Sequence, residues 1–270
     1  MPITREFISF DAQEFYLYKH CDDSEGALNI FKEGTLKFTQ PKNFNDPFDS
    51  YAFIDPSFLI AAKEQTKFSH LNFADNLNEV AQKFLCPIEN TKLLDSVRDK
   101  AFIFCLNLNP LSHLMWSHYA RFHRGFMIEF KFPADINSMQ DDNFQPLEVD
   151  YVEEYPKVGR DVFDNAGDTI RTIFLQKSKE WAYESEYRVI RYGDFPGEFQ
   201  SYDRAKYLSN VIAGMNCSDE YYEKLKITID NMNDQLGTSV KLYRAEKIPN
   251  HYAITVPNHP RLDITKKQSQ

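Results

Sequence analysis

The distribution of apolar and polar residues along the chain predicts a mixture of strands and helices. Apolar residues that alternate or run together indicate strands, and apolar residues three or four positions apart indicate helices. The predicted strands cover residues 14–19, 35–39, 101–106, 125–130, 147–152, 181–191, 210–214 and 240–244. The predicted helices cover residues 27–31, 93–97, 114–122, 168–179 and 219–235. Because the two kinds of element mix without strict alternation, an α+β fold is expected rather than a doubly wound α/β fold.

The predicted elements suggest one domain over residues 1–265. We expect a mixed, mostly antiparallel central sheet with flanking helices. Helical spacing recurs through residues 57–100, which predicts a helical insertion there. Gly34 follows the first short helix and is expected to form its left-handed C-cap. The polar residues 266–270 are expected to form a disordered tail.

Composition and charge exclude several classes of protein. With 42% hydrophobic and 26% charged residues, the chain is expected to be globular. The glycines form neither G-x-G-x-x-G nor a P-loop, which argues against those nucleotide-binding folds. The four Cys form no C-x-x-C pair, which predicts reduced thiols in a cytoplasmic protein. A net charge of −9 argues against strong general affinity for nucleic acid, and no apolar run predicts a membrane span.

The segment from Trp181 to Arg188 carries the most concentrated set of charged candidates. Read as a strand, it has an aromatic face and a charged face. The charged face consists of Glu184, Glu186 and Arg188. Two carboxylates and a guanidinium at this spacing can act on one ligand. A solvated face with one Glu–Arg ion pair is the alternative interpretation.

The segment 41–48 predicts a loop, because two Pro and two Asn do not fit a regular element. Its functional interpretation is a clamp on a flat ligand. Phe44 and Phe48 would stack on a ring while Asn45 or Asp46 bonds the edge of that ring. Turn chemistry alone is the alternative, since Asn and Asp side chains satisfy their own backbone in such turns.

A third segment, residues 112–119, places Trp116, Ser117, His118 and Tyr119 where they can pack and hydrogen-bond around a pocket. A core position for Trp116 is the alternative. The three histidines of this region are five residues apart, which splays them around a helix. Zinc-binding helices use a four-residue spacing instead, so no metal site is predicted.

Five segments, in this order and spacing, resemble the bacterial domain-of-unknown-function 2971 family. They are Leu17–Lys19, Leu36–Phe38, Phe44–Phe48, Met115–Ala120 with Gly125, and Trp181–Arg188. Together they span roughly residues 15–215. The family carries no settled activity. Its members often have an Arg just after the first strand, where this chain has His20 and Cys21.

A more distant resemblance suggests a chemistry. The series strand, Lys19-His20, helix, Glu33-Gly34 and Thr35-Leu36 is similar to the start of ADP-ribosyltransferase-fold proteins, which include toxins that modify DNA. The resemblance implies an ADP-ribosyltransferase-like fold with NAD as co-substrate. It also implies that His20 holds the nicotinamide ribose or a phosphate, and that Glu184 and Glu186 are catalytic.

The implied roles agree with the chemistry of the residues. Breaking the nicotinamide–ribose bond develops an oxocarbenium-like cation, which one carboxylate stabilises. A second carboxylate orients or deprotonates the acceptor. Trp116, Tyr119 and Phe44 would hold nicotinamide or adenine, and Arg188 or Lys19 would pair with the diphosphate. Glu186 is expected to be the primary carboxylate, because it lies deeper in the predicted strand.

The leading hypothesis is therefore an NAD-dependent ADP-ribosyltransferase-like enzyme that acts as a bacterial toxin or phage-defence effector. Its partners would be a small-molecule dinucleotide and an acceptor macromolecule that the sequence does not identify. Two alternatives stay open. A metal-dependent nuclease would bind Mg²⁺ through Asp46, Asp49, Glu184 and Glu186. A non-catalytic binding or interaction module would use Glu184, Glu186 and Arg188 as a structural ion network.

Overall fold

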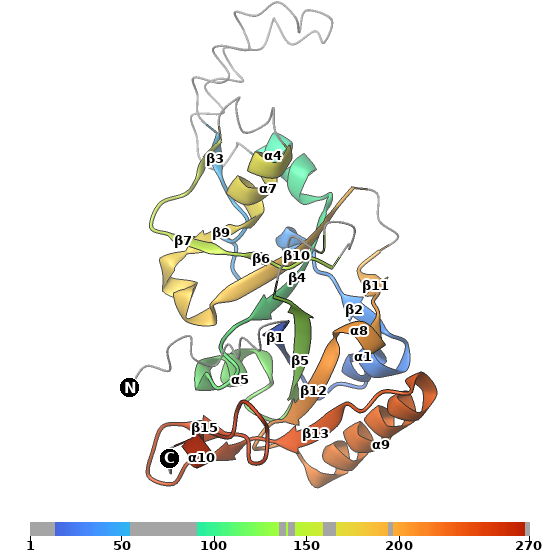
Figure 1. Ribbon diagram of the computed structural model, residues 1–270. Helices are drawn as coiled ribbons and strands as arrows, with labels where there is room; N and C mark the ends of the chain where they lie inside the picture. Colours follow the sequence, from blue (N-terminus) through green and yellow to red (C-terminus); the bar gives the residue numbers. More distant parts are fainter. Residues whose placement is uncertain are drawn as a thin grey trace, which may run out of the picture.

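The computed structural model describes residues 14–54, 91–134, 139, 144–158, 166–193 and 197–267 of the chain. A seven-stranded sheet runs through the molecule (Figure 1). Its strands are β1 (Glu14–Cys21), β4 (Ala101–Asn107), β5 (Phe126–Pro133), β6 (Leu147–Glu148), β10 (Glu186–Tyr192), β12 (Leu208–Ala213) and β13 (Lys241–Arg244). They lie in the order β13-β12-β5-β1-β4-β10-β6, and neighbours are antiparallel except β12 and β13. The expected α+β fold with a mostly antiparallel sheet is confirmed.

In the part of the chain that the structure describes, helices and four two-stranded sheets surround the central sheet. The helices are η2 (Gly26–Leu28), α1 (Asn29–Lys32), η3 (Pro41–Asn43), α4 (Thr91–Arg98), α5 (His113–Tyr119), α7 (Ala166–Phe174), η7 (Lys179–Glu184), α8 (Arg204–Tyr207), α9 (Asp219–Leu236) and α10 (Ile264–Lys267). The small sheets pair β2 (Thr35–Lys37) with β11 (Phe199–Ser201), β3 (Phe53–Ile54) with β8 (Lys157–Val158), β7 (Asp150–Val152) with β9 (Gln176–Ser178), and β14 (Glu246–Lys247) with β15 (Ile254–Thr255). Within the described ranges, no helix combines the length and apolar character needed to cross a membrane.

One face of the central sheet packs against α1, α8 and α9, which lie on the same side of the sheet in Figure 1. Leu17 of β1 and Phe130 of β5 are fully buried there with Phe31 of α1 and Ile229 of α9. Because side chains alternate along a strand, the intervening residues point to the opposite face. This first face is the main hydrophobic core, and it leaves the second face available for polar groups.

The second face carries two separate apolar clusters. One contains Trp116 of α5, and the other contains Phe174 of α7 together with residues of α4. His20 packs edge-on against Trp116, and Arg188 donates to the backbone carbonyl of Phe174. Polar side chains of the second face therefore lie between the two apolar clusters.

A row of directly opposed polar residues crosses this second face. The register pairs Asn210 with Glu129, Glu129 with Tyr18, Tyr18 with Asn107, and Asn107 with Glu186. Directly opposed residues of antiparallel strands place their side chains on the same face. This polar row links five strands, and a buried ionic cluster surrounds each of its two carboxylates.

The sheet loses its pairing between β1 and β4. Over the part of the chain that the structure describes, these strands are partnered only at Tyr18 opposite Asn107. By contrast, β1 is paired with β5 along its whole length, and β4 is paired with β10 along its whole length. Lys19 and His20, at the end of β1, thus extend beyond the point where β1 and β4 pair.

Two predicted elements differ from the structure in ways that affect the candidate site. Residues 181–185 do not belong to a strand, because η7 continues to Glu184 and Ser185 then turns with φ 47°. The helix predicted over 168–179 ends at Phe174, and the chain continues as β9 because it pairs with β7. Lys177 consequently lies on a strand and faces the start of β10.

Other differences are confined to boundaries. The strand predicted over 147–152 is divided into β6 and β7, which join different partners. Helix α5 ends at Tyr119, since residues 121–123 all adopt positive φ. Gly34 has φ 64°, as predicted for a C-cap.

Most of the predicted helical insertion, residues 57–90, lies outside the described residues, and α4 follows it. Lys266 and Lys267 close α10 instead of starting a tail, and residues 268–270 lie outside the described residues.

Candidate functional site

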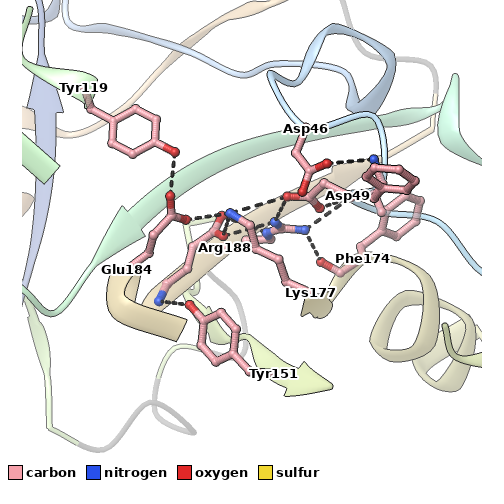
Figure 2. Close-up of polar contacts among 11 residues, drawn as sticks. Asp46, Asp49, Tyr119, Tyr151, Phe174, Lys177, Glu184 and Arg188 are labelled. Carbon is pink, nitrogen blue, oxygen red and sulfur yellow. Dashed lines mark hydrogen bonds and ion pairs between the residues drawn. The ribbon is translucent and has the colours of Figure 1, made fainter. Parts of the chain in front are cut away.

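Three carboxylates and two cations form a buried cluster at the start of β10 (Figure 2). The ammonium of Lys177 lies 2.5 Å from Glu184 Oε2, 2.9 Å from Glu186 Oε2 and 3.5 Å from Asp49 Oδ2. Each of these side chains is at most 7% exposed. A buried ammonium needs its charge balanced by nearby carboxylates. Lys177 contacts all three carboxylates of the cluster and so holds them together.

Arg188 is the second cation and is completely buried. Its Nε donates to Glu186 Oε1 at 2.8 Å, and its Nη2 donates to Asp49 Oδ2 at 2.7 Å. Its Nη1 donates to the carbonyl of Phe174 at 2.7 Å. Because all three nitrogens are bonded to the protein, Arg188 fixes carboxylates in place. Its predicted role of pairing with a diphosphate finds no support in this geometry.

Local structure brings these groups together from four segments of the chain. Asp49 comes from the loop after η3, Lys177 from β9, and Glu184 from the last position of η7. Glu186 begins β10 after the left-handed residue Ser185. The turn at Ser185 lets both glutamates reach the ammonium of Lys177, as the two distances above show.

Electrostatics favour the charged forms of Lys177 and Glu186. Burial by itself lowers the pKa of Lys177, but Glu186, Glu184 and Asp49 outweigh burial and raise that pKa above its ordinary value. Burial by itself raises the pKa of Glu186, but Arg188 and Lys177 outweigh it and hold that pKa below its ordinary value. The formal charges of the three carboxylates and the two cations sum to one net negative charge. The cluster therefore suits a ligand that develops positive charge.

A pocket of about 270 Å³ opens beside the cluster, where β1 and β4 stop pairing. Its walls come from β1, β2, η3 and the loop after it, β4, α5, β9, η7 and β10. Seven residues that the sequence predicts as site residues line this pocket, namely Lys19, His20, Phe44, Asn45, Tyr119, Glu184 and Glu186. The structure thus brings together candidates that are up to 167 positions apart, from Lys19 to Glu186.

Tyr119 points its hydroxyl at Glu184 and donates a hydrogen bond to Glu184 Oε1, as Figure 2 shows. Burial and the charge of Glu184 raise the pKa of Tyr119 well above its ordinary value. The phenol therefore stays protonated and remains a donor. Glu184 is held at one oxygen by Tyr119 and at the other by Lys177, which fixes the orientation of its carboxylate at the pocket wall.

The hydrogen bonds around Asn107 define the protonation of His20. Asn107 Oδ1 accepts from the backbone amide of Asn109, and its Nδ2 donates to the carbonyl of Tyr18. Since these backbone groups fix the side-chain amide, Nδ2 is also the donor to His20 Nδ1, at 3.2 Å. Burial, reinforced by Lys19, lowers the pKa of His20 to about 3, so the imidazole is neutral and its proton lies on Nε2. That Nε2 has no hydrogen-bond partner among the described residues.

Five predicted site residues do not line this pocket. Trp116 is a core residue whose Nε1 donates to the carbonyl of Pro110, which agrees with the alternative of a core position. Asp46 bonds the backbone amide of Phe48 in a turn. Ser117 lies 3.3 Å from a ring nitrogen of His123. The other two are His118, which is exposed on α5, and Arg188.

Two residues of the site were missed by the sequence analysis. Lys177 falls inside a predicted helix, and apolar residues at helical spacing gave no reason to end that helix early. Asn107 is the last residue of β4, and its strand register alone does not reveal that its amide bonds His20. A pairing between 150–152 and 176–178 would have been the signal for Lys177, but parallel pairing leaves no local pattern in so short a segment.

Comparison with known families bears on part of the site. Residues 115–189 match the family model described as "Protein of unknown function (DUF2971)". That segment includes Tyr119, Lys177, Glu184 and Glu186, whereas β1 and the loop after η3 lie outside it. No curated protein and no solved structure matches the chain. The match shows that this segment of the chain is similar to a family of unknown function.

Proposed function

We propose that the pocket beside β1 is the active site of an NAD-dependent ADP-ribosyltransferase-like enzyme. The observation that carries the proposal is the convergence of His20, Tyr119, Glu184 and Glu186 on one pocket where pairing between β1 and β4 ends. These residues supply a neutral donor, a phenol and two carboxylates. That set suits cleavage of a glycosidic bond to a cationic leaving ring.

Glu184 would stabilise the positive charge that develops on the ribose as nicotinamide leaves. Its carboxylate is 3% exposed, so its field is weakly screened by water. Tyr119 and Lys177 hold its two oxygens and prevent the carboxylate from rotating away. This preorganisation lowers the reorganisation needed in the transition state.

Glu186 would support the chemistry indirectly. Arg188 bonds both of its oxygens, and Lys177 bonds one of them. The sequence favours Glu186 as the primary carboxylate because of its depth. Both of its oxygens have cationic partners, whereas only one oxygen of Glu184 does, so we assign the primary role to Glu184 and a positioning role to Glu186.

The remaining pocket residues would bind and orient the dinucleotide. His20 would donate from Nε2 to a ribose oxygen, since Nδ1 already accepts from Asn107. Phe44 would stack on the nicotinamide ring, and Lys19 would pair with the diphosphate. A pocket of about 270 Å³ accommodates the nicotinamide end of the molecule, with the rest extending outward.

The nuclease alternative has less support from the donor set. Asp49 and Glu186 already contact both cations of the cluster, and Asp46 does not line the pocket. Within the described part of the chain, no group of three His, Cys, Asp or Glu residues is arranged to hold a metal ion. A divalent cation would have to displace Lys177 from its three carboxylates, which is costly for a buried ammonium.

Thermal unfolding with NAD⁺ in EDTA tests the proposal. NAD⁺ that binds the folded state should raise the melting temperature of the wild-type protein in a saturable way. Glu184→Gln should lower the rate of nicotinamide release by about 10²–10³-fold while the variant stays folded. Glu129→Gln is the matched control, because it removes a buried carboxylate away from the pocket and should leave nicotinamide release unchanged.

Two outcomes would overturn the proposal. One is the absence of a melting shift up to millimolar NAD⁺. The other is undiminished nicotinamide release by Glu184→Gln. Stabilisation or DNA cleavage that requires Mg²⁺ and is abolished by EDTA would favour the nuclease instead.

A further inference from the structure

A second pocket, of about 450 Å³, shares Lys177 with the first and is otherwise lined by different residues. Its aromatic residues are Phe48, Tyr51, Tyr155 and Trp181. The side chain of Phe48 is 65% exposed and that of Tyr155 is 43% exposed. Large apolar rings that gather at a pocket and remain exposed to water indicate a binding surface.

Three of the rings are in contact with one another. The centroids of Phe48 and Tyr155 are 6.4 Å apart, and those of Tyr51 and Tyr155 are 5.2 Å apart, with tilted planes. Two of the rings already contact cations of the chain, since Lys177 lies 5.0 Å from Trp181 and Arg98 lies 5.8 Å from Tyr51. Phe48 and Tyr155 have no cation over them among the described residues.

Carboxylates complete the lining of this pocket. Glu153, Glu154 and Glu180 are exposed at its walls. Glu153 pairs with Lys179, while Glu154 and Glu180 make no ion pair within the described residues. The charge of Lys177 is already balanced by the carboxylates of the buried cluster. The pocket therefore presents negative charge beside aromatic faces.

We propose that this second pocket binds an organic cation, a guanidinium or an ammonium group. Aromatic faces attract such cations through the ring quadrupole, and nearby carboxylates add charge-assisted hydrogen bonds. Phosphate and carboxylate ligands are disfavoured, because Lys177, the one cation of the lining, is committed to three carboxylates. The inference concerns a different pocket from the proposed active site and does not rest on the proposed function.

Fluorescence provides a direct test, because the chain has only two tryptophans and Trp116 is fully buried in the core. Trp181 lines the pocket and should report its occupancy. The probe is acetyl-Gly-Arg-Gly-amide, and its control is the same peptide with citrulline, which has nearly the same shape and no charge. We expect a saturable change in emission with the arginine peptide only, and a weaker response in high salt.

Variants connect the response to the pocket. Tyr155→Leu removes an aromatic face and should weaken binding about two- to fivefold. Glu180→Gln removes one charge and should weaken binding by a similar or smaller factor, roughly twofold. Glu220→Gln, an exposed carboxylate on α9, is the matched control and should bind normally. Calorimetry repeats the measurement without relying on Trp181.

A further fluorescence titration, in which ethylguanidinium replaces the peptide, identifies whether the cation belongs to a polypeptide or to a small molecule. Tighter binding of the peptide would indicate a cation carried by a polypeptide, and equal binding would indicate a free small cation. An equal response to the citrulline peptide, or unchanged affinity in both Tyr155→Leu and Glu180→Gln, would overturn the inference. The NAD⁺ melting shift, measured in Tyr155→Leu, should be unchanged and keeps this result separate from the proposed function.

Discussion

The two carboxylates of the polar row, Glu129 and Glu186, have similar partners and different surroundings. Glu129 is bound by Tyr18, Asn210 and Arg261, while Arg188 and Lys177 bind Glu186. Both carboxylates are buried. Glu186 lines a pocket, however, whereas Glu129 lines neither of the two pockets described above. A buried ion network is therefore not a sufficient sign of a functional site, and an adjacent pocket distinguishes the two.

Each cluster also has a neutral histidine beside it. His259 Nδ1 accepts from the backbone amides of Arg261 and Leu262, which places its proton on Nε2. Burial lowers the pKa of His259 to about 4 even though Glu129 lies 3.4 Å away. His20 also carries its proton on Nε2, because its Nδ1 accepts from Asn107. His259 attaches the C-terminal segment, whereas His20 lines the pocket of the proposed active site.

The largest expected effect is loss of stability in Arg188→Met. The variant leaves Asp49 and Glu186 buried with only Lys177 to neutralise them, which should lower the free energy of unfolding by about 3–5 kcal/mol. Urea unfolding measures this change. Arg171→Met is the control, since Arg171 forms an exposed pair with Asp150 and its loss should change stability by about 1 kcal/mol or less. A similar change in both variants would mean that burial of the cluster contributes little.

Glu129→Gln should have a smaller effect on stability, about 1–3 kcal/mol. Arg261 is partly exposed, so after the substitution its guanidinium can be hydrated, unlike that of Arg188. The same variant should keep the NAD⁺ melting shift, which Glu184→Gln should weaken. If Glu129→Gln also loses the shift, the two ends of the polar row are coupled and the distinction between them fails.

The smallest expected effect near neutral pH is a dependence of stability on pH through His259. Its pKa is lower in the folded protein than in the unfolded chain, so below about 6.5 the unfolded chain binds more protons. Stability should therefore fall as the pH decreases from 7 toward 4, and this histidine contributes at most about 1.4 kcal/mol per pH unit. His259→Asn should reduce the slope of the free energy of unfolding against pH.

His251→Asn is the matched control for this measurement, because His251 is exposed. It should leave the slope unchanged. His20 contributes in the same direction, since burial lowers its pKa to about 3. An unchanged slope in His259→Asn would show that the imidazole is hydrated in the folded state.

The sequence predicts the strands of the sheet well, because short apolar runs are a local signal for buried strands. The runs Ala101–Leu106 and Gly125–Phe130 correspond to β4 and β5. It also selects Glu184 and Glu186 correctly as neighbours, although their segment is not one strand. A two-residue spacing puts side chains on one side in a strand, and the left-handed turn at Ser185 has the same result. Glu184 and Glu186 are therefore close together even though the strand β10 does not include Glu184.

Contacts between distant segments were not predictable in the same way. The position of Trp116 depends on the carbonyl of Pro110 and on packing against the sheet, and amphipathic spacing does not distinguish a core ring from a pocket ring. The convergence of Lys177 with Asp49 requires pairing of β7 with β9 and the course of the loop after η3. Such contacts depend on tertiary structure and leave no periodic signal.

The polar row has a consequence for how the chain folds. Its five members come from positions 18, 107, 129, 186 and 210, so no local segment can satisfy their hydrogen bonds. Before β12, β5, β1, β4 and β10 are aligned in register, these polar groups remain hydrated. A partial sheet that buried them would leave their hydrogen bonds unsatisfied. Non-local pairing of this kind slows folding. A one-residue slip of any strand would turn its polar member into the main hydrophobic core, so the row also selects against misregistered sheets.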